Sequence, residues 1–130
     1  MSSTRLECSA ASRSGSRRDS PNSLVLQHLA TCRGSMGSDR AVAGILGVSP
    51  AQVSRWRSGQ RPDLDNADRL AGLALVVEML ARWLAPEAVE GWLHGQNAHL
   101  SNRSPAHLIR LGRIAEVIGA IELEKAGVYS

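Results

Sequence analysis

The sequence predicts an all-α protein. Strands favour aromatic and β-branched residues, whereas these 130 residues are rich in Ala and Leu and include three Trp, one Tyr and no Phe. No stretch alternates apolar and polar residues with the period of two that marks a strand, and apolar residues recur instead at helical spacing. Because the hydrophobic fraction of 43% is ordinary for a folded protein, we expect one domain or two small packed subdomains.

The first segment, residues 1–23, is expected to be a disordered tail. It contains eight Ser and four Arg, and after Met1 its only large aliphatic residue is Leu6. Such a segment cannot bury enough apolar area to offset the entropy lost on ordering. We interpret it as a dispensable extension or the product of a misplaced start codon, with a weak basic arm as the alternative.

Residues 24–64 are expected to form short helices joined by tight turns. The run SLVLQHLATC places its apolar residues on one face at helical spacing, which predicts a first helix. Two more helices follow, because residues that favour helix caps, first positions and stops recur at suitable intervals. These residues are Ser38, Gly47, Ser49, Pro50, Gly59 and Pro62.

Residues 65–130 are expected to form a second helical group. The predicted helices span about 65–84, 86–94, 105–111 and 113–126, with Asp65 as the first N-cap and Gly127 as the final stop. The long helix is apolar on nearly every side, which requires burial all round. We therefore expect a central core helix, part of which forms a dimer or partner interface, with Glu78 and Arg82 on its polar edge.

The segment from Ser38 to Gly59 fits a helix-turn-helix. This motif needs a small residue where the helices cross, here Ala43, and a residue that tolerates positive φ at the turn, here Gly47. It also needs inward apolar residues, which are Val42, Leu46, Val48, Val53 and Trp56. The segment resembles the Xre/Cro-like helix-turn-helix family, whose VS-x-x-x-VS-x-W-x-x-G run appears as residues 48–59.

The outward face of the second helix in this motif is expected to bind DNA. Gln can pair with adenine and Arg with guanine in the major groove, while Ser and a helix N-terminus suit phosphate. Segment 24–64 carries five Arg and two Asp, which gives it a modest positive electrostatic field. The alternative to DNA binding is that the motif is kept only for packing or dimerisation. The expected DNA-binding residues are Ser49, Ala51, Gln52, Ser54, Arg55, Arg57 and Arg61.

A second pattern runs through the C-terminal half. It consists of Trp92-Leu93, Asn97, Leu100, Pro105, Leu108, Gly112, Val117, Ile121 and Gly127-Val128-Tyr129. This pattern resembles the toxin-binding domain of the Xre/MbcA/ParS antitoxins, the partners of RES-domain toxins, and the resemblance covers about residues 36–130. It implies that the extreme C-terminus enters the mouth of the active site of a toxin that consumes NAD or uses it to modify a target. It also implies that the front half represses its own operon.

By this resemblance, the segment that blocks the toxin is 127–130. Tyr129 offers a flat anchor with few rotatable bonds, and a terminal carboxylate can meet an Arg intended for substrate phosphate. The alternative is that Tyr129 merely covers the end of the last helix. The tail lies outside the family pattern, and Gly112 lacks the acidic neighbour often found there. The expected toxin-binding residues are Trp92, Asn97, Arg110, Gly112, Arg113, Gly127, Val128, Tyr129 and Ser130.

No catalytic, cofactor or metal site is expected. Catalysis needs convergent groups, but the histidines of the C-terminal half follow no ligand spacing and no Gly-rich phosphate loop accompanies them. His28 and Cys32 lie four residues apart without further ligands nearby, so we interpret Cys32 as a packed thiol. The groups considered and set aside are Cys8, Glu87, Glu90, His94, His99 and His107.

The remaining patterns predict a cytoplasmic protein. No apolar region follows the N-terminal arginines as a signal peptide requires, and the apolar run 70–85 is shorter than the ~20 residues of a membrane span. The leading hypothesis is an antitoxin that binds a RES-domain toxin and operator DNA as a homodimer within a larger hetero-oligomer. The alternatives are a stand-alone dimeric helix-turn-helix regulator and a structural adaptor.

Overall fold

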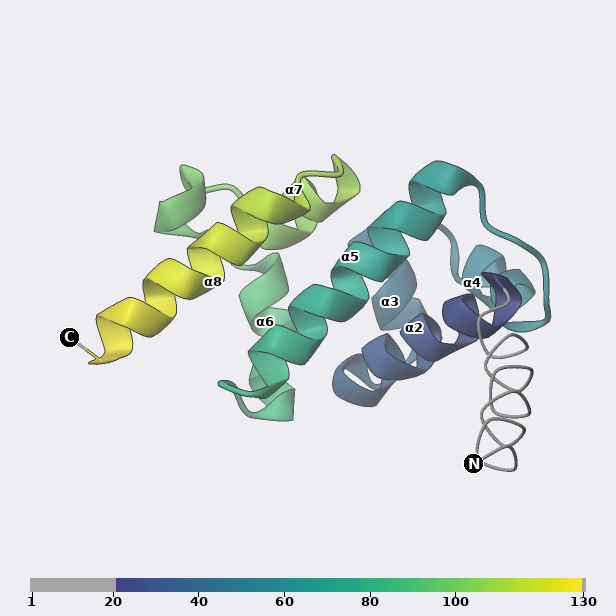
Figure 1. Cartoon of the computed structure of the whole chain (residues 1–130), viewed down its shortest axis with the longest axis horizontal. Coiled ribbons are helices and arrows are strands. Elements are labelled where there is room, and N and C mark those ends of the chain that lie inside the picture. The colour runs from purple at the N-terminus through teal and green to yellow at the C-terminus, as the bar shows by residue number, and fades with distance from the viewer. Residues whose placement is uncertain (1–20, 130) are drawn as a thin grey trace, which may run out of the picture.

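The computed structural model describes residues 21–129 and confirms the all-α prediction (Figure 1). Most of the expected tail lies outside the described residues, and its last three residues belong to the first described helix. The helices are α2 (Pro21–Met36), α3 (Asp39–Leu46), α4 (Pro50–Arg57), α5 (Leu64–Ala81), α6 (Pro86–His94), the 3-10 helix η1 (Ala98–Leu100), α7 (Pro105–Arg110) and α8 (Ile114–Tyr129).

Helix α5 is the central helix, as its apolar sequence predicts. It contacts α2 and α3 on one side and α7 and α8 on the other, while α6 packs against both α5 and α2 (Figure 1). Glu78 and Arg82 are exposed as expected, and Leu75 remains 46% exposed. The buried residues of α5 are Leu70, Leu73, Ala74, Val76, Val77 and Leu80.

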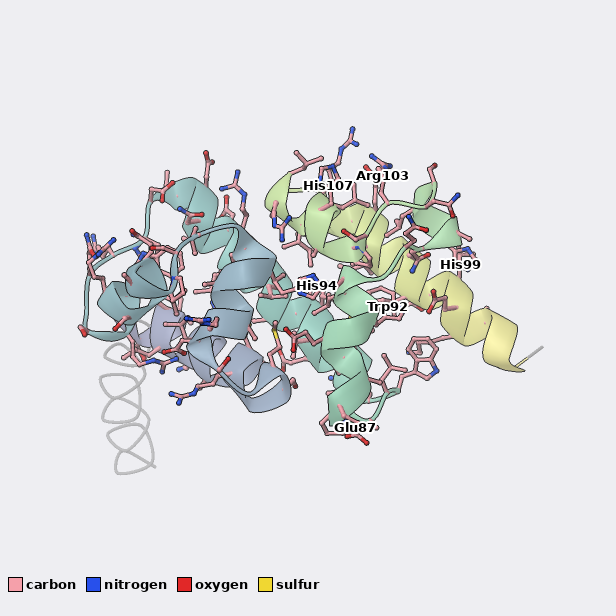
Figure 2. All side chains as sticks on the ribbon, turned by 180° about the vertical axis from the view of Figure 1, so that it is seen from behind. Glu87, Trp92, His94, His99, Arg103 and His107 are labelled. Atoms are coloured by element: carbon pink, nitrogen blue, oxygen red, sulfur yellow. The ribbon has the colours of Figure 1, made fainter. Side chains whose placement is uncertain are left out.

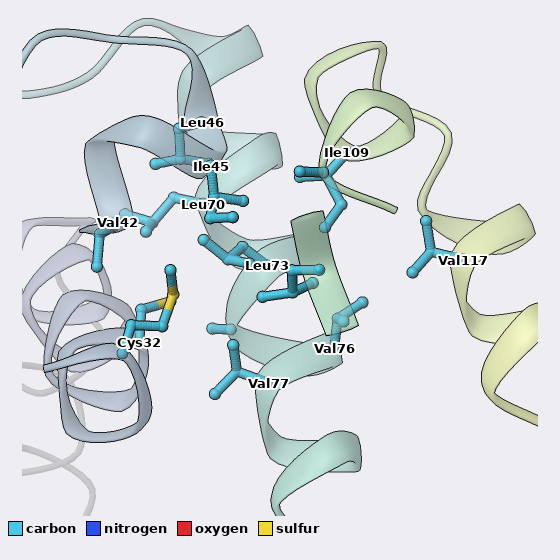
Figure 3. Packing of buried hydrophobic residues seen from close by; sticks show 14 of the residues in the cluster. Cys32, Val42, Ile45, Leu46, Leu70, Leu73, Val76, Val77, Ile109 and Val117 are labelled. Carbon is cyan, nitrogen blue, oxygen red and sulfur yellow. The ribbon is translucent and has the colours of Figure 1, made fainter. Parts of the chain in front are cut away.

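One hydrophobic core joins the two helical groups (Figure 3). Side chains from α2 and α3 meet one flank of α5, and Ile109 and Val117 meet it from α7 and α8. Cys32 is fully buried in this core, which confirms the interpretation of a packed thiol. Burial, with a smaller contribution from the Glu78 carboxylate, raises the pKa of Cys32 to about 12, so the thiol is neutral at pH 7.

Several helix ends differ from the predicted ones, most clearly those of α5 and α8. Helix α5 begins at Leu64 and Asp65 lies in its first turn, so the predicted N-cap at Asp65 is wrong. The same helix ends at Ala81, where the chain tightens into a turn: the Arg82 and Trp83 N–H groups donate to the carbonyls three residues back. Helix α8 continues through Gly127, since a glycine inside a helix costs only about 1 kcal/mol and here avoids the positive φ of a helix stop.

A helix that crosses a membrane must be both long and apolar. Among residues 21–129, none of the helices combines the length and the apolar character that crossing a membrane requires.

Candidate functional site

The turn between α3 and α4 has the geometry expected of a helix-turn-helix. Gly47 adopts a φ of 76° and donates its backbone N–H to the Ala43 carbonyl at 2.9 Å, which ends α3. The Ser49 hydroxyl then accepts the Gln52 backbone N–H at 3.1 Å and begins α4. Any other residue at position 47 would be strained for two reasons. Its φ would be positive, and its Cβ would lie 3.1 Å from Arg110 Cδ.

Helices α3 and α4 turn their predicted apolar face into the core. Ala43, which the motif expects where the two helices cross, is 1% exposed, and Trp56 is 1% exposed. Trp56 Nε1 has no hydrogen-bond partner among the described residues, so this indole contributes through packing alone. The remaining predicted inward residues Val42, Leu46 and Val53 are buried, and Val48 is half-buried.

The outward face of α4 carries the residues expected to bind DNA. Arg55 Nη2 donates to Gln52 Oε1 at 2.6 Å, so the two side chains are held together on this face. Arg61 is exposed in the segment after α4. Ser49, Ala51 and Ser54 are exposed as well.

Arg57 has a protein partner that the sequence pattern did not predict. Its guanidinium forms a two-pronged ion pair with Asp39, in which Nε lies 3.1 Å from Oδ2. Asp39 begins α3 and Arg57 ends α4, so this pair ties the two helices together. The pair therefore gives Arg57 a role within the motif, and its expected contact with DNA stays a prediction.

The Asp39–Arg57 pair is expected to make stability depend on pH. The hydrogen bond from Arg57 lowers the pKa of Asp39 below its ordinary 3.8, against a smaller opposing effect of burial. Because the folded pKa is the lower one, the stabilisation is present above about pH 4 and is lost as pH falls through the folded pKa. D39N should cost about 1 kcal/mol at pH 7 and lose less stability than the wild type on acidification.

Urea unfolding at about pH 7 and about pH 3 measures this effect. D68N is the matched control, since Asp68 is exposed and forms no ion pair among the described residues. Parallel loss of stability in D39N and the wild type would show that this pair does not carry the pH dependence.

Two of the expected toxin-binding residues converge on the C-terminal part of α8. Trp92 Nε1 donates to Glu124 Oε2 at 2.7 Å, and Asn97 Nδ2 donates to Glu124 Oε1 at 3.0 Å. Asn97 is 5% exposed, whereas Trp92 is half-buried beside α8 (Figure 2). Both residues therefore lie against the C-terminal half of α8, with their polar atoms facing Glu124, and their contact with a toxin stays a prediction.

Glu124 is the residue of this cluster that the sequence interpretation missed. It follows Val117 by seven positions and Ile121 by three, so it lies on the buried face of α8. A carboxylate on an apolar helix face requires hydrogen-bonding partners, because burying an unpaired charge is costly. The spacing of Glu124 from Val117 and Ile121 was therefore the sequence pattern that could have identified it.

The other expected toxin-binding residues lie at the opposite end of α8. Arg110 donates from Nε to the Ile45 carbonyl at 3.0 Å and from Nη2 to the Gly44 carbonyl at 2.6 Å. Arg113 pairs with Glu116 at 3.3 Å, and Gly112 forms the turn before α8 with a φ of 79°. Since 16 helical residues extend about 24 Å, these residues are remote from the end of α8.

The expected toxin-binding set therefore does not form one cluster. Arg110 instead joins the two helical groups, because it satisfies carbonyls near the C-terminus of α3. At the chain terminus the backbone of Gly127, Val128 and Tyr129 continues α8. Ser130 lies outside the described residues.

The histidines of the C-terminal half are spread over separate elements (Figure 2). His94 lies 3.9 Å from Glu90 on the exposed surface of α6, and His99 and His107 are exposed on η1 and α7. Within residues 21–129, no group of three or more His, Cys, Asp or Glu side chains could hold a metal ion.

The chain is similar to known proteins over parts of both helical groups. No protein-family model matches the chain. Over 89 residues, 68% of this chain and 79% of the relative, it is 36% identical to the mycobacterial cidal antitoxin MbcA of Mycobacterium tuberculosis and Mycobacterium bovis. One chain of the crystal structure of the M. tuberculosis MbcT-MbcA toxin-antitoxin complex superposes with a TM-score of 0.63 and 31% identity, covering 78% of this chain and 96% of that one. Only 64 residues precede residue 65, so the 89-residue match includes part of the C-terminal half.

Proposed function

Because this chain belongs to the family of the mycobacterial cidal antitoxin MbcA, we propose that it is the antitoxin of a type II toxin-antitoxin system. It acts in the cytoplasm by binding, without catalysis. Its partner is a cognate RES-domain toxin that consumes NAD or uses it to modify a target. Segment 127–130 blocks the mouth of the toxin's active site.

The observation that carries this proposal is the accessibility of the last turns of α8. After Ile121, none of the described side chains of this helix, residues 122–127, is buried. The end of α8 also extends away from the other helices (Figure 1). A helix whose last described side chains are accessible is suited to present the segment after them to a cleft in a partner.

Co-expression with the product of the adjacent gene tests the proposal. We expect the two proteins to co-purify as a hetero-oligomer and the growth arrest caused by the toxin to be relieved. A sizing column gives the stoichiometry of the complex. The absence of any partner protein would favour the alternative, a stand-alone dimeric helix-turn-helix transcriptional regulator.

The proposal includes repression of the protein's own operon through α4. Helix α4 and the end of α8 lie at opposite ends of the long axis, which supports simultaneous binding of operator and toxin (Figure 1). A homodimer would present two α4 helices to paired half-sites. The proposed DNA contacts are Ser49, Ala51, Gln52, Ser54, Arg55 and Arg61, with Arg57 supporting them through Asp39.

Replacing Gln52 and Arg55 together with alanine is expected to weaken binding to the operon's promoter by about 100-fold, because each base contact is worth about 1–3 kcal/mol. Gel shifts over a range of salt concentrations measure this loss, and wild-type affinity should fall steeply with salt. R82A is the matched control, since Arg82 is exposed at the far end of α5. An unchanged shift in the double variant would exclude α4 as the DNA-reading helix.

A further inference from the structure

Both oxygens of the Glu124 carboxylate accept a hydrogen bond, from donors in different parts of the fold. One oxygen accepts from the Trp92 indole of α6, and the other accepts from the Asn97 amide that precedes η1. Hydrogen bonds to an ionised carboxylate are stronger than those between neutral groups. Glu124 therefore joins α8 to two elements that lie 27 and 32 positions earlier in the chain.

The Asn97 donor is itself held in place. Its Oδ1 accepts the His99 backbone N–H at 2.9 Å, so its amide nitrogen must be the atom that faces Glu124. Its backbone N–H donates to the Arg103 carbonyl at 3.2 Å, and its carbonyl accepts N–H groups from Leu100 and Asn102, each at 2.9 Å. An acceptor placed opposite such a rigid donor is fixed in position as well.

The loop that carries Asn97 also contacts α8 at an earlier turn. Arg103 lies 3.5 Å from Glu116, eight residues before Glu124. Ser101 and Asn102 hold the loop in a tight bend with positive φ angles of 58° and 63°. The loop is thus a strap along α8, and Glu124 is its last attachment.

Burial falls off along α8 beyond its first turns. Val117, Ala120 and Ile121 anchor the first turns of α8 in the core, whereas no described side chain from 122 to 127 is buried. The hydrogen bonds of Glu124 therefore tie this less buried part of α8 to α6 and to the loop before η1.

We infer that Glu124 is a positioning residue, which aims the C-terminal turn of α8 and thereby holds segment 127–130 ready to bind. This inference rests on the proposed function, because it says which residue holds the toxin-blocking segment in position before binding. Pre-organisation strengthens binding by reducing the ordering cost that the complex must bear, and the effect is expected mainly in the dissociation rate.

E124Q tests the inference with a nearly isosteric side chain. Glutamine places an amide N–H₂ opposite one of the two donors, so at least one hydrogen bond is lost. Amide hydrogen exchange over residues 122–129 of the free protein should become about 10-fold faster, as should dissociation of an inactive form of the toxin encoded by the adjacent gene. Exchange in α2 to α5 should stay unchanged.

Two further variants make the result specific. E122Q removes an equal charge from an exposed position of the same helix and should behave as the wild type. W92F keeps an aromatic ring, removes one donor and should accelerate dissociation less than E124Q. The combination of W92F with E124Q should be less than additive. Once the Trp92 donor is gone, the glutamine can turn its oxygen toward Asn97 and its amide nitrogen no longer faces a donor.

Each outcome bears on one of the two proposals. Faster exchange in E124Q with an unchanged dissociation rate would overturn the positioning role and leave the proposed function standing, as would unchanged exchange. A wild-type protein that does not bind the toxin, or that binds it equally well without residues 128–130, would overturn the proposed function and this inference with it.

Discussion

Replacing Trp56 with alanine is expected to lower the free energy of unfolding by about 3–5 kcal/mol. Trp56 is 1% exposed, and its helix α4 packs against α2 and α3. Truncation removes the apolar surface that the indole buries on folding, and it leaves a cavity that neighbouring side chains fill only in part. Domains of this size are commonly stable by about 5–15 kcal/mol, so this single change removes a large share of the total. Urea unfolding followed by far-UV circular dichroism measures it.

W56F separates packing from hydrogen bonding. Phenylalanine keeps a ring in the site and removes Nε1, which has no hydrogen-bond partner among the described residues. Burying an unpaired N–H group carries a cost of its own, so this variant should lose only about 1 kcal/mol. If alanine proved as mild as phenylalanine, Trp56 would not be the anchor of the helix-turn-helix.

The elements that the sequence predicted best are those whose ends are set locally. Ser38 and Ser49 accept backbone N–H groups three residues ahead, and Gly47 takes a positive φ, so α3 and α4 begin and end where the pattern placed them. These signals depend on residues within one turn of each helix end. They could be recognised without knowing what packs against the helix.

The ends of α5 and α8 were predicted less well, because they depend on more than the nearest residues. Gly127 looked like a stop, but it does not adopt the positive φ of a left-handed helix stop, and α8 continues to Tyr129. Asp65 looked like an N-cap, but the helix begins one residue earlier at Leu64.

The polar partners in the candidate sites were the least predictable feature. Arg110 reaches carbonyls 65 and 66 positions away, and Glu124 bonds residues 27 and 32 positions away. No periodicity connects residues so far apart, since their meeting depends on how α7 and α8 pack. The sequence pattern therefore identified residues around the end of α8 but not the carboxylate that joins them.

Deleting Val128–Ser130 is expected to abolish neutralisation of the toxin while leaving the fold intact. The deletion removes one aromatic anchor and moves the terminal carboxylate, each of which contributes about 2 kcal/mol or more when buried at an interface. Toxin binding should therefore weaken by at least about 100-fold. The thermal midpoint should hardly change, because no described side chain of α8 beyond Ile121 is buried.

Titration of the toxin's activity with wild-type and truncated protein measures the loss, and the gel shift on the operon's promoter serves as the control for folding. Y129A separates the contribution of the aromatic ring from that of the terminal carboxylate, since it removes the ring and keeps the carboxylate. The competing interpretation, in which Tyr129 only covers the end of α8, makes the opposite prediction. It requires the truncated protein to melt at a lower temperature and still neutralise the toxin, so the two measurements together decide between a blocking segment and a helix cover.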